Sequence, residues 1–231
     1  MLQRLSAAIL LSAISFAGMA QTSAVKDQAE SAWIKQSDEY TNMLLSVQLE
    51  HAPEQGSTQG VAKFDDRISN PSRADEIAER HELEGALAKI KAAQAGVTDK
   101  NVKEDIAILQ KAFNLQFRMQ DFQLAREVPF YNASAQIFQG LRSLLDDQVP
   151  QQRRAAALVR LRKYAGVEPG YKPFTDRLKE REGEQMAKPN VIFPSKQEVE
   201  TDLGRNSTYV EGIATLFKNI SCPAGSLLTK S

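Results

Sequence analysis

The sequence contains only one cysteine, Cys222, and two histidines, His51 and His81. A lone cysteine cannot form an internal disulfide, so the packing of secondary structure must stabilise the fold. The zinc motif H-E-x-x-H needs two histidines one helical turn apart. Segment 81–85, His-Glu-Leu-Glu-Gly, has glycine at the second position. We therefore predict no metal ligand, and we interpret His81 as a solvated or capping residue and His51 as a helix-terminal one.

Other catalytic patterns are also missing from the sequence. It has no G-x-S-x-G nucleophile elbow and no glycine-rich phosphate-binding loop. The carboxylate pairs at 65–66 and 146–147 fall at predicted turns, where turn formation accounts for the aspartates. A Ser-His-Asp set drawn from scattered residues, or a Cys222 thiol beside a histidine, remains an alternative. The residues themselves predict no catalytic group.

Neither sign of charge is in excess, since the chain has 29 Lys and Arg residues and 29 Asp and Glu residues. Nucleic-acid binding depends on a basic surplus that neutralises phosphates, so we predict no nucleic-acid partner. Hydrophobic residues make up 42% of the 231 positions. That fraction is sufficient for a buried core in one large domain or two small ones.

An apolar stretch at 5–16 follows Arg4 and precedes Gly18-Met19-Ala20. A basic residue, a short apolar segment and small residues at a cleavage point are typical of a secretory signal peptide. The stretch is too short for a membrane span, and no later segment is apolar for long enough. We therefore expect an exported protein, periplasmic or secreted, with no transmembrane segment after cleavage. An uncleaved N-terminal anchor is the alternative.

The remaining sequence has the periodicity of helices, with no sustained alternation of apolar and polar residues that would indicate strands. Predicted helices cover 31–50, 72–95, 99–127, 134–145, 154–164, 172–187 and 195–218. Ser72 is a predicted N-cap, and Ser195 with Glu198 has capping-box spacing. The helix at 99–127 has two apolar faces, which favours a central position in a bundle. The predicted fold class is all-α, an irregular multi-helix bundle.

These patterns divide the chain into four segments. Residues 1–20 are the predicted signal peptide, 21–30 a flexible start and 31–218 the helical domain. The segment 219–231 has no helical period, and we interpret it as an atypical tail, either disordered or foreign to the domain.

One region is more specific than a generic helical pattern. It places Pro, Phe and Tyr at a kink and then predicts a helix with a small alanine face and an arginine face at 153, 154, 160 and 162. Its distinctive runs are Tyr131-Asn132, Ile137-Phe138-Gln139-Gly140, 155–166 and Glu168-Pro169-Gly170-Tyr171. With the helix at 198–217, the loop at 64–67, Trp33 and Tyr40, this region resembles the bacterial secreted family known as domain of unknown function 885. The likeness covers about residues 28–218.

The resemblance implies a larger helical fold whose full-length members look like zinc metallopeptidases. In such proteins a metal-activated water attacks a peptide carbonyl, with the glutamate of H-E-x-x-H as base. No position of this chain matches that motif, so we carry over no catalytic residue and no zinc ligand. Family members could use this part as a wall of the substrate cleft. The candidates for that wall are Tyr131, Asn132, Phe138 and Gln139, with simple interhelix packing as the alternative.

Two functions follow as hypotheses. In the first, the chain is the N-terminal part of an exported metallopeptidase-like protein, truncated before the metal motif and without catalytic activity alone. In the second, it is a stand-alone helical module of the cell envelope that binds peptides or a partner protein. Truncation would also expose an apolar helical face, through which copies of the chain could associate.

Overall fold

The computed structural model describes residues 32–218. The predicted signal peptide, the flexible start and the tail with Cys222 lie outside the described residues, which therefore do not test them. Within 32–218 the chain is helical, with no strand apart from one isolated bridge between Glu127 and Ile192. The predicted all-α class is confirmed. No helix of the described part has the length and apolar character needed to cross a membrane.

Eight α-helices and two short 3-10 helices make up the described part of the chain. They are α1 (Ala32–His51), α2 (Pro53–Thr58), η2 (Ala62–Phe64), α3 (Arg73–Ala93), η3 (Gln94–Gly96), α4 (Lys100–Arg126), α5 (Ala133–Leu145), α6 (Gln151–Tyr164), α7 (Phe174–Met186) and α8 (Lys196–Lys218).

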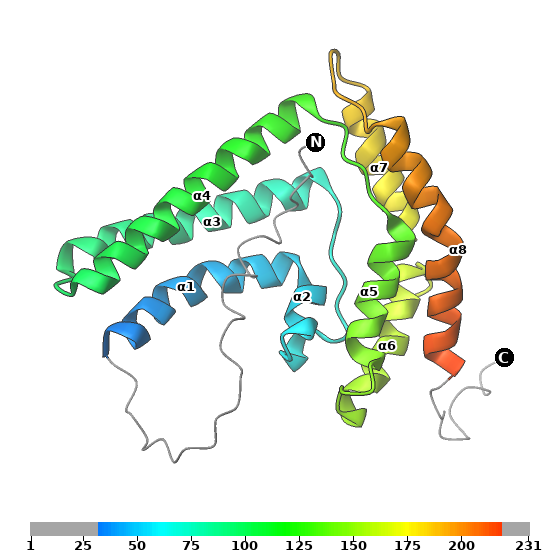
Figure 1. Ribbon diagram of the computed structural model, residues 1–231, viewed down its shortest axis with the longest axis horizontal. Helices are drawn as coiled ribbons and strands as arrows, with labels where there is room; N and C mark the ends of the chain where they lie inside the picture. The colour runs from blue at the N-terminus through cyan, green and yellow to red at the C-terminus, as the bar shows by residue number, and fades with distance from the viewer. Residues whose placement is uncertain (1–31, 219–231) are drawn as a thin grey trace.

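The helices form two groups that splay apart like the sides of an arch (Figure 1). The first arm consists of α1, α3 and α4 around a core that includes Leu44, Ile90, Ile106 and Phe113. The second arm consists of α5 to α8, and its cores are built on Leu141, Leu144, Tyr164, Phe174 and Leu178. Helix α2 lies between the arms and packs on α5.

Capping residues set several helix ends as the sequence predicts. The Ser72 side chain accepts a hydrogen bond from the backbone N–H of Asp75 at 3.2 Å. Asp99 caps α4 in the same way. At α8 the capping box closes in both directions, because the Ser195 N–H donates to Glu198 Oε2 at 2.8 Å and the Glu198 N–H donates to Ser195 Oγ at 3.2 Å. Local polar chemistry therefore accounts for where these helices begin.

Two features of the helical domain differ from the sequence-based expectation. The predicted break after His51 contains a helix, α2, because Pro53 and Glu54 suit the first turn of a helix. The expectation that 99–127 is central in a bundle is wrong. Helix α4 packs on α1 and α3 through one face, and its second apolar face, which includes Ile108 and Phe122, is exposed.

Candidate functional site: the polar joint between the two arms

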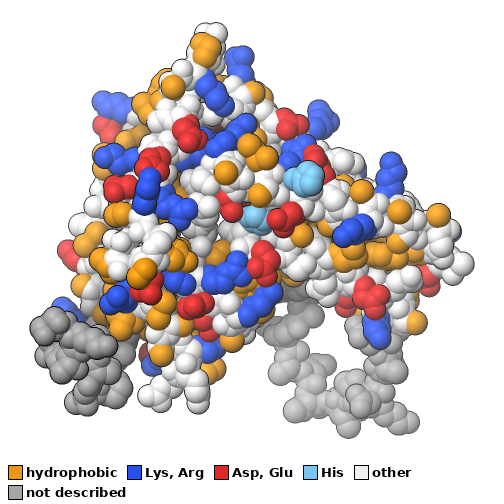
Figure 2. All heavy atoms as spheres, turned by 180° about the vertical axis from the view of Figure 1, so that it is seen from behind, with side chains coloured by type: hydrophobic (Ala, Val, Ile, Leu, Met, Phe, Trp, Pro, Cys, Tyr) orange, Lys and Arg blue, Asp and Glu red, His pale blue; other side chains and the backbone are white. Residues whose placement is uncertain are grey.

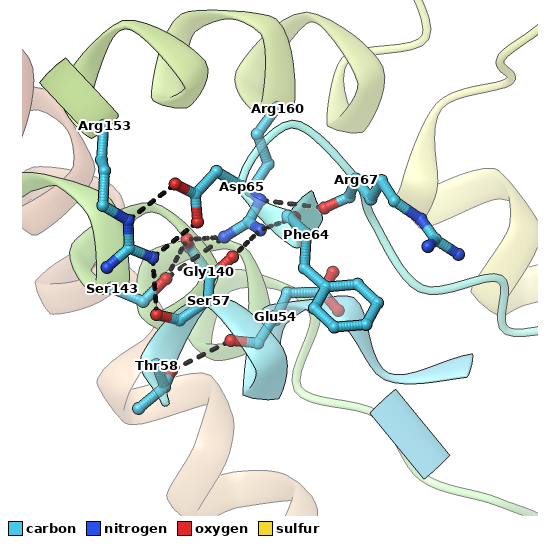
Figure 3. Close-up of polar contacts among 10 residues, drawn as sticks. All are labelled: Glu54, Ser57, Thr58, Phe64, Asp65, Arg67, Gly140, Ser143, Arg153 and Arg160. Carbon is cyan, nitrogen blue, oxygen red and sulfur yellow. Dashed lines mark hydrogen bonds and ion pairs between the residues drawn. The ribbon is translucent and has the colours of Figure 1, made fainter. Parts of the chain in front are cut away.

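The most elaborate polar cluster of the described chain lies where α6 meets α2 and the segment 59–72. Arg153 and Arg160 are seven residues apart on α6, so they project from one face of the helix. Figure 3 shows both arginines pointing from α6 toward Ser57, Phe64 and Asp65. We call this cluster, with its partners on α2, α5 and 59–72, the joint.

Arg160 is the centre of the joint and is fully buried. Its Nε donates to the carbonyl oxygen of Arg67 at 2.9 Å, Nη1 donates to the Gly140 carbonyl at 2.6 Å and to Ser143 Oγ at 3.2 Å. Its Nη2 donates to Ser57 Oγ at 2.6 Å and to the Phe64 carbonyl at 2.8 Å. These five contacts use the donor capacity of the guanidinium and connect α6 to α2, α5 and the loop.

The charge of Arg160 is stabilised by dipoles rather than by a bound carboxylate. All five of its acceptors are neutral. Burial lowers the pKa of Arg160 below the usual arginine value, and the more distant negative groups Glu54 and Asp65 oppose this shift without outweighing it. Asp65 is bound elsewhere, because Arg153 holds it with two hydrogen bonds of 2.7 and 2.6 Å. Arg153 also donates to the Ser57 carbonyl at 2.8 Å.

Neighbouring residues of α6 extend the joint. Lys163 Nζ donates to the Asp66 carbonyl at 2.6 Å. The Tyr164 hydroxyl donates to Glu54 Oε1 at 2.8 Å, and the same carboxylate accepts the Ser69 N–H at 2.9 Å. Burial, with the nearby Glu54 charge, raises the pKa of Tyr164 far above its usual value, so the hydroxyl stays a donor. These contacts hold α6 against α2 and the 59–72 segment.

The arginines singled out in the sequence do not share one face. Arg153 and Arg160 enter the joint, whereas Arg154 donates to the carbonyls of Asp147 and Val149 before its own helix. Arg162 is half-exposed and pairs with Glu168 at 2.9 Å.

A second polar contact ties α3 to α7. Arg181 holds Glu76 with two hydrogen bonds of 2.8 Å each. Tyr131 lies nearby, and burial followed by the Glu76 charge raises its pKa to about 12. This bridge thus connects the two arms directly, whereas the ion pair of the joint connects the second arm to the 59–72 segment between them.

A histidine with two carboxylate neighbours ties the end of α1 to α3. His51 Nδ1 is 3.1 Å from Asp75 Oδ2, and Nε2 is 3.5 Å from Glu82 Oε2. Burial alone lowers the pKa of His51, but Asp75 and Glu82 outweigh it and the net pKa lies above the usual value. Glu79 faces the same group, and burial raises its pKa. Both histidines appear in pale blue on one face, with acidic side chains around them (Figure 2).

The His51 contacts predict a pH-dependent contribution to stability. Because the folded state holds the proton more tightly, the contribution is complete below the unfolded pKa of about 6.5 and is lost as pH rises through the folded pKa. We therefore expect His51→Gln to lose most stability, relative to the natural protein, near pH 6, and less near pH 8, with urea unfolding as the measurement. The control is His81→Gln on exposed α3 surface, and an equal pH trend in both variants would contradict the assignment.

Among residues 32–218, no three His, Cys, Asp or Glu side chains are arranged so that they could hold a metal ion. The described residues therefore do not fit the zinc that the family resemblance implies. Gly85, at the position where H-E-x-x-H has its second histidine, lies on the exposed surface of α3. We assign no metal-dependent step to these residues.

The four predicted cleft residues lie near one another along the chain but have different surroundings. Asn132 caps α5 by accepting the Ala135 N–H at 2.9 Å. Tyr131 packs against the core of the second arm, and Phe138 packs on Tyr209 of α8 with ring centroids 5.8 Å apart. Gln139 is exposed. Capping and packing explain three of them, in line with the interhelix-packing alternative, and the substrate-wall role stays a prediction.

The family described as "Bacterial protein of unknown function (DUF885)" matches residues 53–227. The chain belongs to this family. The match begins at α2, includes every residue of the joint and the α3–α7 bridge, and extends through residues 219–227 of the predicted tail. No curated protein matches the chain, and no solved structure matches it.

Proposed function

We propose that this chain is the non-catalytic helical scaffold of an exported, metallopeptidase-like protein of the DUF885 family. The observation that carries the proposal is the joint. Arg160 is completely buried, yet every one of its hydrogen bonds goes to the protein itself. A cluster built in this way fixes the angle between the arms and offers no group to a substrate.

The other parts of the proposal have separate support. The pattern of residues 1–20 supports export, and the likeness of 128–171 to the family supports the metallopeptidase-like character. In this proposal the chain contributes no zinc ligand and no catalytic group, so it holds no zinc and is inactive alone.

The test of inactivity uses the purified chain with one equivalent of zinc. We expect no stoichiometric zinc by metal analysis after dialysis and no peptidase activity that a chelator abolishes. Stoichiometric zinc, or chelator-sensitive cleavage of a mixed peptide pool, would overturn the proposal.

A second candidate function is a helical module that binds peptides or a partner protein of the envelope. One observation supports it, a groove of about 560 Å³ between α3 and α4. Lys91 and Arg118 line this groove, together with Arg80, which lies over the Phe117 ring at 4.1 Å from its centroid and pairs with Glu84 and Asp121 of the same groove. Titration with acidic peptides tests this candidate, and saturable binding lost in Arg118→Glu would favour it over the scaffold.

A further inference from the structure

Helix α4 carries a second apolar stripe on the side that faces away from its own arm. Ile108, Leu115, Met119 and Phe122 are 61%, 55%, 44% and 52% exposed. Their spacing of seven, four and three residues places them along one face of the helix. We call these four residues the outer stripe. It spans about 21 Å of helix, and α4 runs along the outer edge of its arm, where another molecule can reach it (Figure 1).

The outer stripe has the same pattern in both directions from Leu115. Ile108 lies seven residues before Leu115, and Phe122 lies seven residues after it. Lys111 and Met119 are each four residues away. If two α4 helices pack antiparallel with their Leu115 side chains in contact, Ile108 of each meets Phe122 of the other. The aliphatic stem of each Lys111 then covers the other Met119.

The ends of the outer stripe carry opposite charges. Glu104 and Arg126 lie eleven residues before and after Leu115, on the same face of the helix. Both side chains are exposed, and Glu104 makes only a loose contact with exposed Lys100, at 3.6 Å. Antiparallel packing brings Glu104 of one copy to Arg126 of the other at both ends, and it opposes the two helix dipoles.

We propose that the outer stripe is an interface for a second copy of this chain, packed antiparallel with Leu115 on a two-fold axis. The self-matching order of apolar and charged residues is what a two-fold contact requires, since each surface must complement itself. An acidic partner helix or an anionic lipid surface would match Arg126 but would repel Glu104. This proposal is independent of the scaffold function.

The size of the contact sets the expected strength. A single pair of helices buries less than the roughly 1,200 Å² typical of stable interfaces. The dimer should therefore be reversible, with a dissociation constant in the range of about 10 µM.

Sedimentation velocity of the purified full chain, from about 1 to 300 µM, tests the dimer. We expect a concentration-dependent shift from monomer to dimer. Leu115→Glu places two carboxylates at the two-fold axis and should weaken association by at least about tenfold. The matched control is Ile77→Glu on α3, because Ile77 is 53% exposed but lies outside the outer stripe. Ile77→Glu should leave the dimer intact. The urea unfolding midpoints of Leu115→Glu and Ile77→Glu show whether each variant keeps its fold.

Charge reversal tests the antiparallel arrangement itself. Glu104→Arg and Arg126→Glu should each weaken the dimer, and the double variant should restore it. A chain that stays monomeric throughout, a dimer that survives Leu115→Glu, or a double variant that does not recover would overturn the proposal. Leu203 is an exposed apolar residue of α8. Oligomers larger than the dimer that disappear in Leu203→Glu would also overturn the proposal, because they would indicate a head-to-tail contact between different faces.

Discussion

Arg160→Ala is expected to cost about 4 kcal/mol of unfolding free energy, a large loss for one substitution. Arg160 is fully buried, so the whole effect of the change falls on contacts inside the protein. It leaves the Arg67 carbonyl without its donor, and it removes the charged donor from the carbonyls of Phe64 and Gly140, which keep the Arg67 N–H and the Ser143 hydroxyl as partners. A hydrogen bond to a charged group contributes about 1.5–3 kcal/mol, and relaxation or water entry recovers part of the loss of five such bonds. Urea unfolding, with the midpoint and slope compared between proteins, measures the effect.

Arg162→Ala is the matched control for this prediction. It removes the same side chain two residues later on α6, where Arg162 is half-exposed and paired with Glu168. We expect a loss of at most about 1 kcal/mol. Arg160→Lys should resemble Arg160→Ala, because an ammonium group cannot reproduce the planar fork. Similar midpoints for Arg160→Ala and Arg162→Ala would show that the joint does not stabilise the fold.

Gly166→Ala is expected to destabilise the protein by about 3 kcal/mol. Gly166 ends α6 with φ of 70°, in a turn where its N–H donates to the Lys163 carbonyl and the Val167 N–H donates to the Arg162 carbonyl. This arrangement of two bonds is the Schellman motif. An added Cβ would lie against the Pro173 backbone nitrogen and 2.5 Å from its Cδ. The obstacle is main chain and cannot rotate away, so the cost exceeds that of the backbone conformation alone.

Gly170→Ala separates the two contributions. Gly170 also has a positive φ, 84°, but an added Cβ would meet nothing within 4 Å. Its replacement should cost only the left-handed conformation, about 1 kcal/mol. Thermal or urea unfolding of the two variants in parallel gives the comparison. Equal losses would mean that the contact with Pro173 relaxes freely.

The helical domain could be predicted well from the sequence because its determinants are local. Ser72, Asp99 and the Ser195–Glu198 box act within one turn of the chain, and they lie where the structure places the helix starts. The position of α4 could not be predicted in this way. Two apolar faces on one helix show that both can be buried, but they do not show whether a neighbour covers each of them.

The joint was harder to predict than the helices. The arginines of α6 and the loop at 64–67 stand out separately in the sequence, and nothing in either pattern pairs one with the other. The Pro and Gly residues of 53–60 predict a loop there, which gives Glu54 and Ser57 no role. One signal was available, since Arg153 and Arg160 are seven residues apart and flank the apolar run 155–159. Charged residues at that spacing on both sides of an apolar run indicate a buried polar partner.

The joint also has a consequence for the order in which the chain acquires its structure. Arg160 is 103 residues from Ser57 and 96 residues from Phe64 along the chain. During synthesis α1 to α4 emerge well before α6, and their mutual contacts can form without it. The carbonyls of the 59–72 segment then stay hydrated until the guanidinium arrives and displaces that water. The angle of the arch is therefore set late, when the second arm is already present to define it.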